Sequence, residues 1–165
     1  KYYNDTFVCY SYSKSLSLPG ERIGYIIVPD EMADSKRVMA AVNGAGRALG
    51  FVCAPVLLQK AVAMCADVPS DIEAYARNKD LLYNGLTRLG YDCVRPQGAF
   101  YLFVKSPEKS GEFSERAKKH DVLVVPSDSF GCPGYVRISY CVAEKTILDS
   151  LPVFKAIMEE LKAEN

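Results

Sequence analysis

The segment after residue 70 is the feature that most constrains the fold. From Ser70 to Gly90, apolar residues recur at the spacing of one face of an α-helix. Ser70 is the expected N-cap, Glu73 completes a capping box, and Gly90 is a typical C-terminal stop. The apolar positions on this face are Ile72, Tyr75, Leu82, Leu86 and Leu89. This is the first long amphipathic helix of the chain, so we place a boundary between two structural units just before it.

The residues beyond this helix alternate between short strands and helices. Segments rich in β-branched and aromatic residues predict strands at 91–94, 99–104, 122–126 and 135–141. A short helix is expected at 112–120. A final helix is expected from residue 143 to about 162, where Pro152 should split or kink it. This order of elements predicts an α/β fold in two layers.

The first 69 residues predict a thinner unit. The expected elements are strands at 6–12 and 22–28, a helix from Asp30 to about Val42, and a buried helix over 50–66. The glycines of segment 43–46 should interrupt the chain between the two helices. Two strands and two helices leave a sheet with open edges, which a free-standing domain avoids. We therefore expect residues 1–69 to end a larger domain, residues 70–165 to form a second one, and the chain to be the C-terminal part of a longer protein.

Composition excludes several classes of function. The 165 residues carry 20 basic and 20 acidic side chains, so no net field attracts nucleic acid or an anionic membrane. No apolar stretch reaches the roughly 20 residues that span a bilayer. Six cysteines without a CxxC pair and a single histidine, His120, predict neither zinc nor disulfides. We expect no metal, no nucleic acid, no membrane, and six buried or half-buried thiols in a reducing cytoplasm.

The stretch SYSKSLSLPGERIG, residues 11–24, holds the candidate chemistry. Ser11-x-x-Lys14 fits a polar strand end with a solvated lysine, and it also fits the S-x-x-K of Ser/Lys acyl-transfer enzymes. Ser/Lys acyl-transfer enzymes need two further sequence motifs, and segments 127–129 and 145–147 match those motifs only in part. The glycines of segment 44–50 resemble the phosphate-binding pattern G-x-G-x-x-G, but their spacing is one residue too long and they follow a predicted helix instead of a strand. We interpret them as a turn that ends a helix.

Three motifs together are more specific than any one of them. Ser11-x-Ser13-Lys14 with Pro-Gly and Arg22 resembles the cofactor-lysine segment of class I/II aminotransferases, which are fold-type I pyridoxal-phosphate enzymes related to aspartate aminotransferase. Segment 96–101, PQGAFY, resembles the PxGAFY strand of their small domain. Segment 136–139, VRIS, resembles their carboxylate-binding segment. The resemblance spans essentially the whole chain.

This resemblance implies a fold, a cofactor and a site. The fold would be the end of the large cofactor-binding domain plus the two-layer α/β small domain. Lys14 would form a Schiff base with pyridoxal 5′-phosphate, and Ser11, Ser13 and Arg22 would bind its phosphate. Arg137 would hold the substrate α-carboxylate through two parallel hydrogen bonds. The family implies amino acid and 2-keto acid substrates and a homodimer.

Other functions stay open at this point. A C–S β-lyase of the same fold would use the same lysine and arginine. A noncatalytic domain would use the segment for packing or partner binding alone. The family places the groups that stack on the cofactor and pair with its pyridine nitrogen before the lysine, so we expect the 165-residue chain alone to be inactive.

Overall fold

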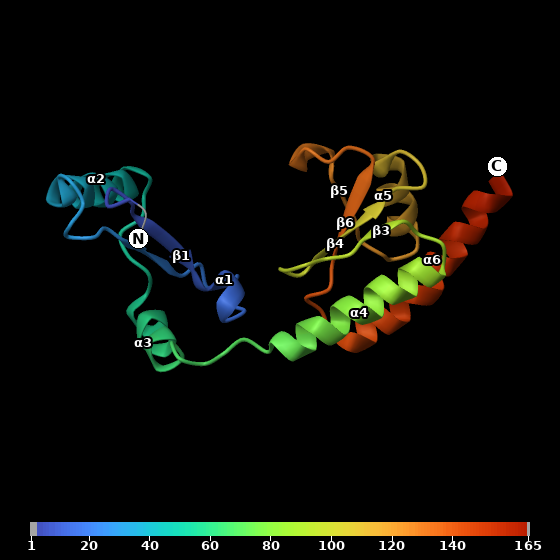
Figure 1. Cartoon of the computed structure of the whole chain (residues 1–165), viewed down its shortest axis with the longest axis horizontal. Coiled ribbons are helices and arrows are strands. Elements are labelled where there is room, and N and C mark those ends of the chain that lie inside the picture. Colours follow the sequence, from blue (N-terminus) through green and yellow to red (C-terminus); the bar gives the residue numbers. More distant parts are fainter. Residues whose placement is uncertain (1–2, 165) are drawn as a thin grey trace. The chain divides into compact units, whose positions relative to one another are not determined.

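The computed structural model describes residues 3–164 and divides at residues 70 and 71 into two compact units (Figure 1). Unit 1 precedes the division and unit 2 follows it. Both units combine helices with antiparallel sheet, which confirms the predicted α/β class. Each unit is described by itself.

Unit 1 is built around a two-stranded antiparallel sheet. Strand β1 (Val8–Ser11) leads into the one-turn helix α1 (Tyr12–Ser15), and strand β2 (Gly24–Ile27) returns beside β1. Helices α2 (Ser35–Ala48) and α3 (Val56–Met64) follow. Both strands were predicted from their β-branched and aromatic residues.

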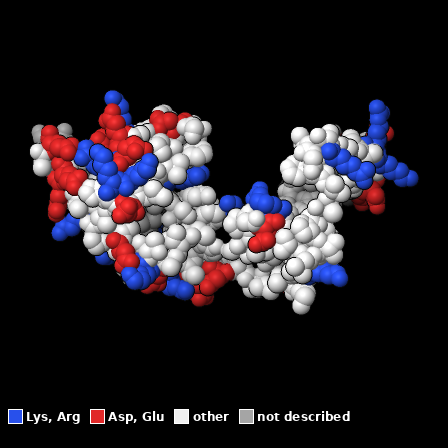
Figure 2. Space-filling view, turned by 180° about the vertical axis from the view of Figure 1, so that it is seen from behind, with Lys and Arg blue, Asp and Glu red and all other residues white. Residues whose placement is uncertain are grey.

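Two predictions for the helices of unit 1 are wrong. Helix α2 continues through Gly44 and Gly46 instead of ending before them, because two glycines weaken a helix by only about 1 kcal/mol each. Helix α3 is shorter than predicted and is not buried, since Val62 alone of its residues is buried. Figure 2 shows a broad uncharged surface on unit 1, whereas acidic and basic side chains intermingle over unit 2.

Unit 2 contains a four-stranded antiparallel sheet in the order β3-β4-β6-β5. The strands are β3 (Cys93–Val94), β4 (Tyr101–Lys105), β5 (Val125–Pro126) and β6 (Tyr135–Ser139). The helices are α4 (Ile72–Arg88), α5 (Ser110–Lys119) and α6 (Glu144–Glu164), with a 3₁₀ turn, η1 (Asp128–Phe130), before β6. All of these strands and helices lie within a few residues of their predicted positions.

The core of unit 2 lies between one face of the sheet and the three helices. Alternate residues of β4 and β6 point to this side, because successive side chains of a strand face opposite ways. Its fully buried members include Leu102, Val136, Leu86, Phe113 and Phe154. Helices α4 and α6 run side by side below the sheet (Figure 1). The other face of the sheet carries half-buried residues, Arg137 among them.

Two details at the ends and interior of the helices differ from the predictions. Asp71, not Ser70, caps α4, because its carboxylate accepts the Ala74 N–H at 2.9 Å, while the Ser70 hydroxyl donates to the Ser15 carbonyl. Helix α6 continues through Pro152 without a break, so the split that was predicted as one of two outcomes does not occur. The proline costs a backbone hydrogen bond, but the buried residues that follow it keep the helix on the core.

The cysteines also differ from the prediction. All six are free thiols, but Cys9, Cys53, Cys65 and Cys141 are exposed instead of buried. Within residues 3–164, no group of histidine, cysteine or acidic side chains is arranged to hold a metal ion. No helix in the described part of the chain is long and apolar enough to cross a membrane.

An ion-pair network ties α5 to the end of α6. The Arg116 guanidinium donates to Glu108 from Nε and to Glu164 from Nη1, both at 2.8 Å. These bonds to Arg116 hold the pKa of Glu164 below its usual range. The pair therefore stabilises the fold above the unfolded-state pKa of Glu164, and this contribution disappears as pH falls through the lowered folded-state pKa.

We expect Arg116→Ala to return the pKa of Glu164 toward its ordinary value, because its main hydrogen-bond donor is gone. NMR titration of the Glu164 carboxyl carbon measures this directly. Lys155→Ala, which breaks only an exposed pair with Glu159, is the control and should leave Glu164 unchanged. An identical titration of Glu164 in the Arg116→Ala variant would show that the network does not set its charge.

Candidate active site

The predicted lysine lies on a capped helical turn at one end of the β1–β2 hairpin. Ser11 is the N-cap of α1, and its hydroxyl oxygen accepts the Ser13 N–H at 3.2 Å while donating to the Ser13 hydroxyl at 3.0 Å. Lys14 is the third residue of this turn and is exposed. The sequence analysis placed Lys14 at a strand end. The cap instead turns the chain into a helix, which brings both hydroxyls and the amine into one turn.

The hairpin end depends on a glycine. Gly24 pairs with Ser11, and a β-carbon at position 24 would lie 2.3 Å from the Tyr10 carbonyl oxygen. Only glycine allows the two strands to approach this closely. The neighbouring Ile23 is buried, and its carbonyl accepts the Tyr12 N–H at 3.1 Å. These contacts fix the start of α1 against β2, and so fix the backbone that carries Lys14.

Arg22 lies at the same end of the hairpin, two residues before Gly24. Its backbone adopts a positive φ of 51°, and its Nη1 donates to the Pro19 carbonyl at 2.8 Å. Gly24, two residues after Arg22, pairs with Ser11, while one edge of the Arg22 guanidinium is bonded to Pro19. A guanidinium carries five N–H donors, so this bond uses only part of its capacity. Hydroxyls, a guanidinium and an amine are the donor set that suits a phosphate and an aldehyde.

Three tyrosines pack together beside this turn. The Tyr10 and Tyr25 rings stack at 5.1 Å between centroids, and Tyr12 meets Tyr10 edge-on at 5.3 Å. Aromatic pairs of this kind stabilise neighbouring strands. The sequence analysis did not single out these tyrosines. Tyr10 and Tyr25 are directly opposite each other in the hairpin, so their contact can be predicted once the register of the two strands is known.

Arg137 lies in unit 2, on the sheet face opposite the core. It is half-buried and sits between Phe103 of β4 and Val125 of β5 in the sheet. Its guanidinium carbon lies over the Tyr101 ring, 4.2 Å from the centroid, and over the Phe130 ring at 4.3 Å. Among residues 3–164, no carboxylate forms an ion pair with it. Tyr101 and Phe130 were not predicted as site residues.

The strongly perturbed thiol of unit 2 lies outside this site. Burial raises the pKa of Cys93 to about 11, with the nearby Asp92 adding to the shift and a hydrogen bond with Thr87 opposing it. Burial also raises the pKa of Tyr91, whose hydroxyl donates to the Phe154 carbonyl at 2.8 Å. Since a protonated thiol is a poor nucleophile, the raised pKa does not favour Cys93 as a reactive group.

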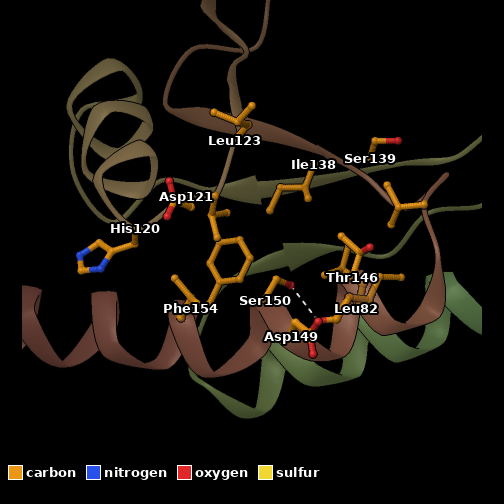
Figure 3. A pocket seen from close by; sticks show the side chains of 14 residues that line it. Leu82, His120, Asp121, Leu123, Ile138, Ser139, Thr146, Asp149, Ser150 and Phe154 are labelled. Atoms are coloured by element: carbon orange, nitrogen blue, oxygen red, sulfur yellow. Dashed lines mark hydrogen bonds between the residues drawn. The ribbon is translucent and has the colours of Figure 1, made fainter.

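A groove of about 530 Å³ opens on unit 2 between segment 120–124 and the first half of α6 (Figure 3). Leu123 and Phe154 contribute to its mainly apolar lining, and Asp121 and Asp149 add carboxylates. Ile138, whose side chain belongs to the core face of β6, lines the groove, while its neighbour Arg137 does not. Arg137 is therefore not a lining residue of the groove, although Ser139 of the same strand is.

The sequence matches the aminotransferase class I and II family over residues 1–151, so the chain belongs to this family. Members of the family depend on pyridoxal 5′-phosphate. The aspartate/prephenate aminotransferase of Thermus thermophilus is 35% identical over 88% of this chain and 39% of its own length. A probable aspartate/prephenate aminotransferase of Aquifex aeolicus is 32% identical over 96% of this chain and 42% of its own length.

Solved structures agree with this assignment. An amino transferase from Eubacterium rectale is 60% identical, covers 97% of this chain and superposes with a TM-score of 0.83. The aspartate aminotransferase of Thermotoga maritima is 25% identical over 93% of this chain, with a TM-score of 0.77. The chain spans about two fifths of the length of these relatives. The fold is therefore that of an aspartate aminotransferase, in part.

Proposed function

We propose that this chain is the C-terminal part of a pyridoxal-phosphate-dependent aminotransferase, and we call that longer protein the full-length enzyme. The chain would supply the cofactor lysine and the carboxylate-binding arginine. The observation that supports the proposal is the turn at the hairpin end, in which Ser11 caps the helical turn that carries Ser13 and Lys14, within a chain of this family. The share of its relatives that the chain covers supports a longer protein.

The residues of the hairpin end suit the cofactor. The Ser11 and Ser13 hydroxyls and the guanidinium of Arg22 would bind the phosphate group, since hydroxyls and guanidinium both donate to anionic oxygens. The Lys14 amine would bind the aldehyde carbon covalently. The bound cofactor supplies an electron sink that stabilises negative charge at the substrate α-carbon.

Lys14 and Arg137 would divide the remaining work. When it is not bound to the cofactor, the Lys14 amine would accept the proton of the substrate α-carbon as general base and give it up again as general acid. Arg137 would bind the α-carboxylate through two parallel N–H···O bonds and so orient the substrate. An amino acid becomes a 2-keto acid in one half of the reaction, and a second 2-keto acid becomes an amino acid in the other. By analogy with the family, we also propose a cytoplasmic homodimer.

Arg137→Lys tests the role of the arginine. Lysine keeps the positive charge but cannot form the planar bidentate contact, so we expect kcat/KM for an amino acid to fall about 10–100-fold. Steady-state kinetics of the full-length enzyme with an amino acid and a 2-keto acid measure this change. Arg95→Lys is the matched control, because Arg95 also stacks on a ring, Tyr83, but lies outside the site.

The same assay separates the competing functions. A 2-keto acid that retains the carbon skeleton of the amino acid identifies transamination, whereas pyruvate and ammonia from a cysteine conjugate identify a β-lyase. Equal kcat/KM for the wild type and the Arg137→Lys variant would contradict the role that we assign to Arg137. An unchanged absorbance spectrum on addition of cofactor would instead indicate a noncatalytic protein.

A further inference from the structure

We propose that Tyr101 and Phe130, which we call the aromatic pair, are positioning residues that hold the Arg137 guanidinium ready for a carboxylate. This inference rests on the proposed role of Arg137 as the carboxylate-binding group. The pair would act through Arg137 and not by reacting with the substrate. Its effect would be on how tightly a carboxylate binds and on which anions bind.

The geometry is that of two cation–π contacts on one cation. The Arg137 guanidinium carbon lies 4.2 Å and 4.3 Å from the two ring centroids, well within the roughly 6 Å at which such contacts attract. An arginine side chain has many rotamers, and each must be given up when a carboxylate binds. Two ring contacts already restrict the rotamers of Arg137 in the absence of substrate, so less entropy is lost on binding.

Tyr101 is placed by the register of the sheet. It pairs with Ser139 across β4 and β6, while Arg137 pairs with Phe103, so Tyr101 and Arg137 are diagonal neighbours on one face. The Phe100 ring packs against Tyr101 at 4.6 Å between centroids. The position of the Tyr101 ring therefore follows from regular strand pairing and does not need the substrate.

Phe130 is placed by an anchored loop. Ser127 is fully buried, and its carbonyl accepts the N–H of Phe130 at 3.0 Å and that of Cys132 at 3.1 Å. The left-handed backbone of Gly131, with φ of 74°, then turns the chain away. The Phe130 side chain is 50% exposed and is not part of the core. Its contact with Arg137 accounts for a large apolar ring at this exposed position.

The residues around Arg137 leave its N–H groups available to an anion from outside the protein. The rings contact the guanidinium carbon by cation–π attraction, which uses none of the N–H donors that lie in the guanidinium plane. No carboxylate of residues 3–164 pairs with Arg137, so no internal acid occupies those donors. Nearby rings also exclude water, which strengthens a charge-assisted hydrogen bond. The arrangement favours a planar carboxylate bound edge to edge.

NMR of the 165-residue chain tests the pair without relying on catalysis. Ring currents should shift the Arg137 Nε–H signal upfield, and titration with 3-phenylpropionate gives the dissociation constant of a carboxylate. We expect Phe130→Leu to move the signal downfield and to weaken binding about 3–30-fold, with Tyr101→Leu acting in the same direction. Tyr83→Leu is the control, because it removes a ring from Arg95 and should leave Arg137 unaffected.

Kinetics of the full-length enzyme provide the second readout. Phe130→Leu should raise KM for phenylalanine by a similar factor with kcat within about threefold, and should leave the affinity for 2-phenylethylamine, which lacks the carboxylate, unchanged. The inference is overturned if Phe130→Leu leaves the Nε–H signal in place and carboxylate binding within twofold of wild type. An enzyme without transaminase activity would refute the proposed function, while the NMR titration would still decide whether the aromatic pair positions Arg137.

Discussion

Replacing Lys14 by Ala in the full-length enzyme is expected to abolish measurable transamination. The variant loses both the covalent bond to the cofactor and the amine that moves the proton, and the proton transfer alone is worth about 10²–10⁴-fold in rate. Steady-state rates with an amino acid and a 2-keto acid measure the loss. Borohydride reduction followed by peptide mapping should find the cofactor attached to Lys14 in the wild type and to no residue in the variant.

The matched control for this experiment is Lys36→Ala, since Lys36 is an exposed lysine of unit 1 on α2. It should keep wild-type activity and the adduct at Lys14. A Lys14→Ala variant with wild-type activity would contradict the proposed function. The 165-residue chain, assayed beside the full-length enzyme, should be inactive. If it transaminates amino acids alone, it contains all the groups that the reaction needs.

Leu86→Ala is expected to lower the free energy of unfolding of unit 2 by about 3–5 kcal/mol. Leu86 is fully buried where α4 meets α6 and the sheet. Its neighbour Gly85 shows how close the helices are, because a β-carbon there would lie 2.6 Å from Leu151 Cδ2. A packed site of this kind cannot collapse around a deleted side chain. Thermal unfolding followed by circular dichroism should show a fall in Tm of about 10–30 °C.

Leu148→Ala is the control because it removes the same atoms from α6 at a position that is 47% exposed. Its cost should stay below about 1 kcal/mol, since little apolar surface returns to water. Equal destabilisation by the two substitutions would show that the contacts of α4 with the sheet do not determine the stability of unit 2. Urea unfolding with an unchanged m-value checks that both variants start from the same native state.

Local rules predicted the elements of unit 2 and failed where partners distant in sequence compete. Strand and helix positions follow from spacing and residue type, which act within a few residues. The cap of α4 depended on the Ser70 hydroxyl bonding to Ser15 instead of to the helix. The continuity of α6 through Pro152 depended on burial of the residues beyond it. Neither outcome is encoded in the neighbouring residues.

The candidate site also has features that the sequence predicted and features that only the structure revealed. The motifs around Lys14, Arg22 and Arg137 predicted which residues would carry the chemistry, because each reaction step demands a particular functional group. The motifs did not reveal that Ser11 caps the turn of Lys14 or that Gly24 must lack a β-carbon. The requirement at Gly24 depends on the antiparallel register of the hairpin, which forms between segments more than ten residues apart.

The sequence by itself determined the family and most of the order of the elements, and it predicted which amine and which guanidinium belong to the site. Only the tertiary structure decided what surrounds the guanidinium. Tyr101 reaches Arg137 through strand pairing, and Phe130 reaches it through a loop anchored on buried Ser127. Cation–π contacts depend on distances that a linear pattern does not contain. The physical reason is that residue type fixes the possible chemistry, while packing fixes which groups meet.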